Sequence, residues 1–147
     1  MSGHLFPLCP DRSMESNLVR LEALWVHGGV YIDSDVSFVR PLDPLLRHGC
    51  FLGFESKGLL GMAVIGAVPG HPAIRAALNV MMAHVRAGGP RSTAPNVLTP
   101  VFANRSDVTL LPEPAFYPVP YGSTDIRQDW SADERVFAVH HWHGSWL

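Results

Sequence analysis

Two aspartates, Asp33 and Asp35, have the residue type and spacing best suited to chemistry in this sequence. They follow a Gly28-Gly29 turn and the run Val30-Tyr31-Ile32, whose β-branched and aromatic residues predict a buried central strand covered on both faces. Side chains alternate along an extended strand, so a spacing of two predicts both carboxylates on one side, with Ser34 pointing away. There they could hold Mg²⁺ or Mn²⁺ through oxygen ligands and present it to a phosphate.

A second interpretation of the same residues is a pair of solvated turn aspartates, which is the commoner meaning of a bare Asp-x-Asp. The preceding Gly-Gly turn and apolar strand favour the metal site. Near the C-terminus, His140, His141 and His143 suggest zinc, since neutral imidazoles are good ligands and residues 141 and 143 would share a strand face. Solvated or hydrogen-bonded histidines are the favoured alternative, because no further ligand is placed beside them.

The elements that must position these residues follow from hydrophobic periodicity and turn residues. Alternating helices and short apolar strands predict an α/β fold, with a mostly parallel sheet flanked by helices. In such sheets ligands collect at the carboxyl ends of strands, where the aspartates are expected. We expect helices at 15–27, 72–87 and 95–104, a short helix capped by Asp43 with Pro44 in first position, and strands at 30–32, 50–55, 62–68, 108–111 and 135–139.

Length and composition exclude several classes of protein. A chain of 147 residues with 47% hydrophobic and 16% charged residues predicts one globular domain. A net charge of −2 with scattered Lys and Arg predicts no nucleic-acid partner. The longest apolar stretch, 59–68, is shorter than the ~20 residues of a membrane-spanning helix. No signal peptide is recognised, so we expect a location in the cytoplasm or at the inner face of the membrane. Cys9 and Cys50 fit no metal spacing and are assigned no function.

From about residue 13 to its end, the sequence resembles the DXD-containing sugar transferases of glycosyltransferase family 32. That family includes α-mannosyltransferases and enzymes of capsular polysaccharide biosynthesis. Each motif is short, but together and in this order they are specific. The matching segments are 16–20, 28–36, 40–43, 51–55, 65–67, 70–72, 138–140 and 145–146.

The resemblance implies a GT-A-like, Rossmann-like catalytic domain over residues 1–147. It also implies a UDP- or GDP-sugar donor, Mn²⁺ or Mg²⁺ as the cofactor, a glycan or other acceptor, and transfer with retention. Asp35 would bind the metal directly, and Asp33 would bind the donor ribose, or the metal through water. His140 would lie near the metal. The other donor-binding positions implied are Asn17, Arg20, Ser145 and Trp146. No residue is identified as the catalytic nucleophile or base.

Two departures from the family pattern bear on function. Asn17 stands where family members often have Asp, so a charge is lost while hydrogen bonding is kept. Little sequence precedes the strand at 30–32, which implies an N-terminally truncated domain without the first nucleotide-binding strand, or one completed by a partner chain or oligomer. Two other functions therefore stay open: a non-catalytic module that binds metal, nucleotide sugar or glycan, and a metallohydrolase that uses the aspartates with the histidines.

Overall fold

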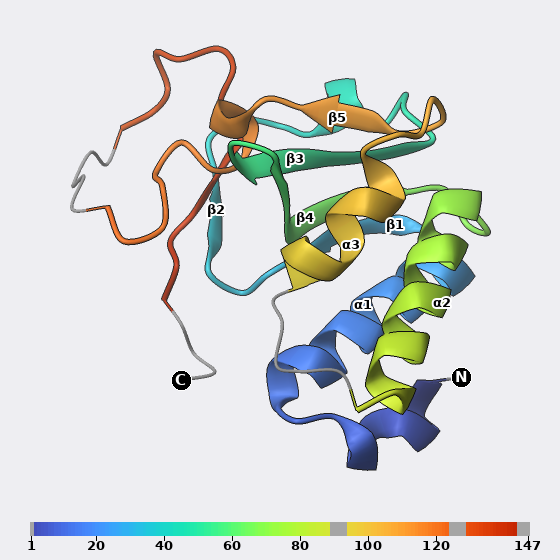
Figure 1. Ribbon diagram of the computed structural model, residues 1–147. Coiled ribbons are helices and arrows are strands. Elements are labelled where there is room, and N and C mark those ends of the chain that lie inside the picture. Colours follow the sequence, from blue (N-terminus) through green and yellow to red (C-terminus); the bar gives the residue numbers. More distant parts are fainter. Residues whose placement is uncertain (1, 89–93, 124–128, 144–147) are drawn as a thin grey trace.

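The computed structural model describes residues 2–88, 94–123 and 129–143, which form one mixed sheet, a two-stranded sheet and a layer of helices (Figure 1). The α-helices are α1 (Arg12–His27), α2 (Pro72–Arg86) and α3 (Ala94–Phe102). The strands are β1 (Gly29–Ile32), β2 (Val36–Phe38), β3 (Cys50–Ser56), β4 (Leu59–Ala67), β5 (Thr109–Leu111) and β6 (Ala138–His140). Three 3-10 helices are described: η1 (Ser2–Leu8), η2 (Asp43–Leu45) and η3 (Glu113–Ala115).

Helix α1 leads directly into the strand that carries the aspartates. It begins three residues earlier than predicted, because the Asp11 side chain caps it by accepting a hydrogen bond from the Met14 backbone N–H at 2.9 Å. It ends as predicted at Gly28, which has a φ of 65°. A Cβ on Gly28 would lie 2.5 Å from Pro69 Cδ, so only glycine permits this sharp exit into β1.

The prediction of a mostly parallel sheet is wrong. The strand order is β1-β4-β3-β5, and of its three pairings only that between β3 and β5 is parallel. The physical reason is that β3 and β4 are joined by a tight turn containing Gly58 (φ 82°), and such a turn permits only antiparallel pairing. No α-helix separates β1, β2, β3 and β4 in the chain, so the crossover connections that parallel pairing needs are missing here.

Strand β1 is not the central, doubly covered strand that its apolar sequence predicts. Among the described residues it lies at the edge of the sheet and pairs with β4 alone (Gly29 opposite Ala67, Ile32 opposite Val64), and its residues are half-buried or exposed. The side chain of Tyr31 is turned toward α1 and the aspartates instead of a second layer. The apolar run 30–32 therefore predicted a strand correctly, but it did not predict the position of that strand in the sheet.

Two hydrophobic clusters sandwich the sheet. The helices cover one face, where Leu18, Ile74 and Met81 pack with Leu52 and Ile65 from the strands (Figure 1). The opposite face is covered by η3 and the C-terminal segment, through the buried residues Phe51, Val64, Phe116, Tyr117 and Ala138. The helices and the sheet form one packed layer pair. On the opposite face of the sheet, η3 and the C-terminal segment bring residues that are distant in the sequence to the end of β1.

Most other predicted elements are confirmed with small changes of bounds: the helices at 72–87 and 95–104 are α2 and α3, and the strands at 50–55, 62–68 and 108–111 are β3, β4 and β5. The short helix η2 forms, but Leu42 is its N-cap, while Asp43 makes no side-chain cap bond and Pro44 is second. The strand expected at 135–139 is β6, and it pairs antiparallel with β2, which the sequence did not indicate.

Among the described residues no helix combines the length and apolar character needed to cross a membrane. Both cysteines are free. Burial raises the pKa of the Cys50 thiol to about 12, so it stays protonated and unreactive at neutral pH.

Candidate active site

The two aspartates lie in a tight turn, not on an extended strand. The Asp33 N–H still bonds to Ala63 of β4 at 2.8 Å, but the Val36 N–H then donates to the Asp33 carbonyl at 3.2 Å and closes a turn over residues 33–36. The predicted alternation of strand side chains is therefore wrong here. The carboxylates nevertheless converge, because the turn and the pairing of β2 with β6 bring both close to His140.

Two side chains contact the same carboxylate oxygen of Asp33. The Tyr31 hydroxyl donates to its Oδ1 at 2.7 Å, and Arg20 Nη2 of α1 lies 3.2 Å from the same oxygen. The Arg20 guanidinium also lies over the Tyr31 ring, 4.4 Å from its centroid, and donates to Met62 O and Ser16 Oγ. Burial raises the pKa of Tyr31, which keeps its proton available for this bond. Buried Arg20 is thereby fixed in one place beside the carboxylate.

Asp35 ties the C-terminal segment to the turn. Its backbone carbonyl accepts from the His141 N–H and its Oδ2 from the His143 N–H, both at 2.9 Å. Its Oδ1 lies 3.3 Å from His140 Nε2. The positions 35 and 140 are far apart in the chain, and the pairing of Val36 with His140 in the small sheet sets their approach.

His140 is the residue of this site that most needs an external partner. Its side chain is almost fully buried against Tyr117 and Trp142, with ring centroids 5.6 and 4.1 Å away. The distance from Nε2 to Asp35 suits an ion pair, but its alignment does not make a hydrogen bond, and within the described residues neither ring nitrogen has one. Burial lowers the pKa of His140, which favours the neutral imidazole with a lone pair free to bind a metal.

Asp33, Asp35 and His140 each offer a ligand atom within 4.8 Å of the others. Carboxylate oxygens suit hard divalent cations, and one imidazole nitrogen is accepted more readily by Mn²⁺ than by Mg²⁺. The orphaned His140 nitrogens and the paired carboxylates fit such an ion. Of the three C-terminal histidines, only His140 joins a cluster of this kind in the part of the chain that is described.

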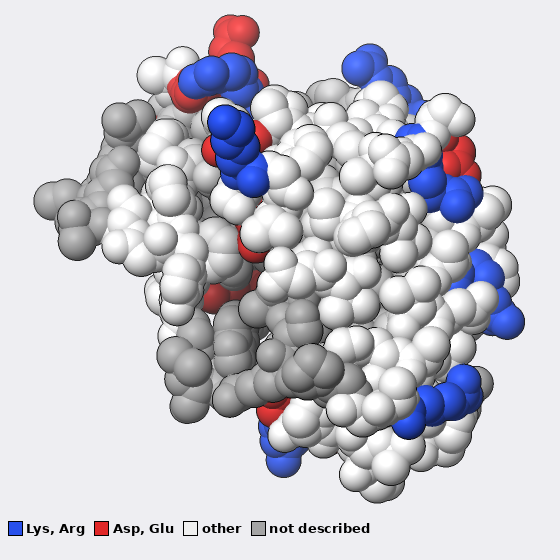
Figure 2. Space-filling view, in the orientation of Figure 1, with Lys and Arg blue, Asp and Glu red and all other residues white. Residues whose placement is uncertain are grey.

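The ligand atoms open onto a cavity of about 900 Å³, which is large enough for a nucleotide sugar. Figure 2 shows acidic atoms inside a recess of the surface, while Lys and Arg are spread separately around it. Two predicted donor-binding residues, Asn17 and Arg20, lie one turn apart on α1 and line this same cavity. The other two, Ser145 and Trp146, lie outside the described residues.

Sequence reasoning missed Glu55, Tyr117 and Trp142, which also line the cavity. Glu55 lies in segment 51–55, which resembles family 32, but no role was predicted for it. The sequence did contain a pattern that could have identified Glu55, because this acidic residue follows the apolar run 51–54 much as Asp33 follows 30–32. Tyr117 and Trp142 carried no such signal, because they lie outside regular strands and helices and only the fold brings them to His140.

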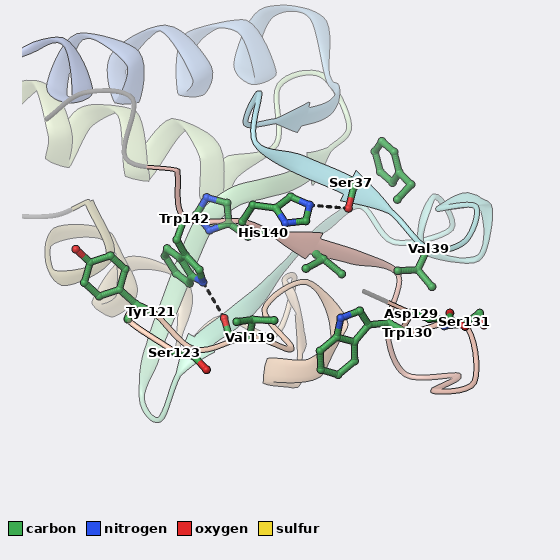
Figure 3. A pocket seen from close by; sticks show the side chains of 14 residues that line it. Ser37, Val39, Val119, Tyr121, Ser123, Asp129, Trp130, Ser131, His140 and Trp142 are labelled. Atoms are coloured by element: carbon green, nitrogen blue, oxygen red, sulfur yellow. Dashed lines mark hydrogen bonds between the residues drawn. The ribbon is translucent and has the colours of Figure 1, made fainter. Parts of the chain in front are cut away.

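A second cavity, of about 880 Å³, adjoins the first and shares Tyr121, His140 and Trp142 with it. Figure 3 shows Trp142 directed toward Val119, whose carbonyl accepts from the indole Nε1 at 2.7 Å. Trp142 has a φ of 57°, a left-handed conformation that costs a bulky residue energy. It is held by this bond and by the bonds that the flanking His141 and His143 N–H groups donate to Asp35. His141 is bound to Ser37 at 2.8 Å instead of turning to the aspartates.

An α/β fold with a carboxylate pair beside a nucleotide-sized cavity is the arrangement expected of a DXD-containing sugar transferase. Residues 4–52, which include Arg20, Asp33 and Asp35, match the glycosyltransferase sugar-binding region containing a DXD motif. Residues 4–52 are therefore similar to the DXD-containing region of sugar transferases, in agreement with the resemblance to family 32.

The relatives are hexosyltransferases. Lactosylceramide 4-alpha-galactosyltransferase of Rattus norvegicus is 27% identical over 95% of this chain and 41% of its own length. Inositol phosphoceramide mannosyltransferase 3 of Schizosaccharomyces pombe is 37% identical over 43% of this chain and 18% of its own. Among solved structures, PaToxG Glycosyltransferase matches 61% of this chain and 34% of its own with a TM-score of 0.50 at 20% identity. This chain thus spans less than half the length of these proteins.

Proposed function

We propose that this protein is a metal-dependent glycosyltransferase that moves a hexose from a nucleotide-sugar donor to an acceptor hydroxyl. The observation that carries the proposal is the meeting of Asp33, Asp35 and buried His140 at the wall of a cavity large enough for the donor. The DXD match over residues 4–52 supports it, and so do the two relatives, which are by name a galactosyltransferase and a mannosyltransferase.

Asp33, Asp35 and His140 would hold Mn²⁺, with Mg²⁺ as the less suited ion. The bound ion would supply positive charge to the diphosphate as it leaves the sugar. Arg20 positions Asp33 and places a second positive charge at the cavity wall. Asn17, one turn away on α1, offers an amide for the donor sugar.

The proposal also includes the nature of the fold, the substrates and the stereochemistry. We propose a GT-A-type fold, a UDP- or GDP-linked donor, a glycan or other acceptor, retention of configuration, and donor contacts from Ser145 and Trp146. The structural likeness to PaToxG Glycosyltransferase supports the fold. The two relatives named above differ in both sugar and acceptor, and hexose transfer is what their names share.

Calorimetric titration with UDP-galactose and GDP-mannose, with and without Mn²⁺, tests this proposal. We expect one donor to bind only when Mn²⁺ is present, followed by slow release of its nucleotide. Binding without any turnover would instead identify a non-catalytic binding module. Cleavage of a simple phosphoester such as p-nitrophenyl phosphate, with no sugar involved, would favour a metallohydrolase. Absence of both donor and metal binding would overturn the proposal.

A further inference from the structure

The second cavity, of about 880 Å³, has no role in the function proposed above, although its volume lies within the range of sites for small ligands. Its walls come from β2, β6 and the loop residues 119–123 and 129–131 (Figure 3). It meets the large cavity that contains the metal cluster, which we call the donor cavity, because Tyr121, His140 and Trp142 line both. A ligand in the second cavity would therefore lie next to the donor.

Charge distinguishes the two cavities. The donor cavity is lined by Arg12 and Arg20 as well as by the residues of the metal cluster, so it suits a diphosphate. Among the described residues that line the second cavity there is no Lys or Arg, and Asp129 is the one carboxylate. The bond from the Ser131 N–H, 2.8 Å from Asp129 Oδ1, lowers the pKa of Asp129 and keeps it charged at neutral pH. These surroundings disfavour a phosphate and favour a neutral ligand whose hydroxyl groups can donate.

Two aromatic rings lie where the cavities meet. Tyr121 is 76% exposed although most of its ring is apolar, and its ring centroid lies 5.5 Å from that of half-buried Trp142. Trp142 is fixed by its bond to the Val119 carbonyl, and its left-handed backbone is a form of strain that is concentrated at ligand sites. The C–H groups on one face of a pyranose ring pack well on the electron-rich face of an aromatic ring. The two rings therefore offer a surface for a sugar.

The other end of the second cavity combines apolar and polar groups. Figure 3 shows Trp130, Asp129 and Ser131 at the end opposite Tyr121. Trp130 is buried and packs with neighbouring valines, so it contributes an apolar wall. The Asp129 carboxylate and the hydroxyls of Ser37 and Ser131 are hydrogen-bonding groups. A saccharide needs both kinds of surface, since its rings have apolar faces and its edges carry hydroxyl groups.

We infer that the second cavity binds the acceptor of the transfer, a neutral saccharide whose ring packs on Tyr121 and Trp142. This inference rests on the proposed glycosyltransferase function. Retention of configuration requires the new bond to form on the face of the sugar from which the diphosphate leaves, so the acceptor must approach from the side of the metal. The second cavity meets the donor cavity on that side, at His140.

The bonds of the transfer balance with this arrangement. The acceptor oxygen bonds to the anomeric carbon of the donor sugar, and the bond from that carbon to the diphosphate oxygen breaks. The electron pair of the broken bond leaves on the diphosphate, and the proton of the acceptor hydroxyl passes to that diphosphate.

Calorimetric titration with lactose, maltose and methyl α-mannoside, in the presence of UDP and Mn²⁺, tests the inference without any turnover. We expect at least one of these saccharides to bind. Tyr121→Ala changes an exposed position, so it should fold like wild type but bind that saccharide about tenfold more weakly. Tyr121→Phe keeps the ring and should restore binding. Leu46→Ala, at an exposed apolar residue that lines neither cavity in the described structure, is the matched control and should bind like wild type.

A second measurement locates the saccharide relative to the metal. Mn²⁺ is paramagnetic and broadens the proton NMR signals of molecules bound close to it, whereas Mg²⁺ does not. We expect the signals of the saccharide to broaden when protein, UDP and Mn²⁺ are present together, and to stay sharp when Mg²⁺ replaces Mn²⁺.

Several results would overturn the inference. They are binding of none of the three saccharides, equal saccharide affinities of wild type and Tyr121→Ala, and saccharide signals that Mn²⁺ leaves sharp. A loss of UDP affinity in Tyr121→Ala as large as its loss of saccharide affinity would make the ring a nucleotide contact instead. If these results accompany normal donor turnover, they overturn the acceptor site alone. Saccharide binding by a wild-type protein that releases nucleotide from no donor would overturn the proposed function, and the acceptor role with it.

Discussion

At the scale of single residues, the three cavity carboxylates differ because their partners differ. Asp33 faces the cation of Arg20, Asp35 faces the neutral ring of His140, and Glu55 faces no described partner. Charge and hydrogen bonding thus give the three carboxylates of one cavity different surroundings. The residue types alone do not predict these different surroundings, because all three are ordinary acidic residues in the sequence.

Replacement of Asp35 by Asn should remove most Mn²⁺ binding. An amide is a weaker ligand than a carboxylate and its charge no longer attracts the cation, so we expect at least a tenfold rise in the Mn²⁺ dissociation constant. Calorimetry or electron paramagnetic resonance of free Mn²⁺ measures it. Asp43→Asn, at an exposed residue of η2, is the matched control and should bind Mn²⁺ like wild type. Equal affinities in all three proteins would remove Asp35 from the metal site.

Replacement of Arg20 by Gln should destabilise the fold. It removes the cation beside Asp33 and leaves the buried Met62 carbonyl without its donor. Breaking a buried pair typically costs about 3 kcal/mol, because the remaining charge is uncompensated. Urea unfolding measures the loss of free energy, and Arg86→Gln, exposed at the end of α2, should cost much less. Comparable losses in the two variants would argue that Arg20 is only a surface helix residue.

At the scale of elements, glycines of β4 decide what packs against the sheet beside the site. A Cβ at Gly61 would lie 2.2 Å from Tyr117 Cζ, so the Tyr117 ring occupies the space a side chain would fill. From there its hydroxyl accepts from the Ala63 N–H at 2.9 Å and its ring contacts His140. A strand residue with no chemistry of its own thereby sets the position of a predicted metal ligand.

Gly61→Ala should accordingly cost about 1–3 kcal/mol of stability, because the Tyr117 ring must move out of a closely packed site. It should also weaken Mn²⁺ binding, since His140 would lose its packing partner. Unfolding by urea and metal calorimetry on the same sample test the two effects. Gly3→Ala is the control, as nothing lies within 4 Å of its added Cβ. An unchanged unfolding curve for Gly61→Ala would contradict the packing argument.

At the scale of the whole molecule, the site joins segments distant in the chain. Helix α1 supplies Arg20, the turn after β1 supplies the aspartates, and β6 supplies His140. The only regular pairing between the turn and the C-terminal segment in the described structure is the three-residue ladder of β2 with β6. A ligand that bridges the cluster should therefore stabilise the fold as a unit.

Mn²⁺ together with UDP should raise the unfolding temperature of the whole protein. A ligand that binds only the folded state adds about 2.7 kcal/mol at a concentration of 100 times its dissociation constant. Differential scanning calorimetry across an Mn²⁺ series would show this shift, and Asp33→Asn should abolish it. A shift that persists unchanged in Asp33→Asn would place the metal elsewhere on the molecule.

The sequence by itself determined the local elements and the residue types of the site. The stop at Gly28 and the apolar faces of α1 and α2 depend on neighbouring residues, so both helices were predicted, although the start of α1 after the Asp11 cap was missed. Because Asp-x-Asp follows a recognisable strand, its metal role could be proposed before any geometry was known. The resemblance to DXD-containing transferases is also a property of sequence alone.

Only the tertiary structure decided how those parts meet. Strand direction depends on connections and partners, so the sheet proved mixed and β1 lies at its edge. The small sheet of β2 and β6 pairs residues about a hundred positions apart, and local patterns carry no information on that contact. The carboxylates converge through a turn instead of strand alternation, and Glu55 is distinguished by burial without a partner. These properties depend on long-range packing and desolvation, which exist only once the chain is folded.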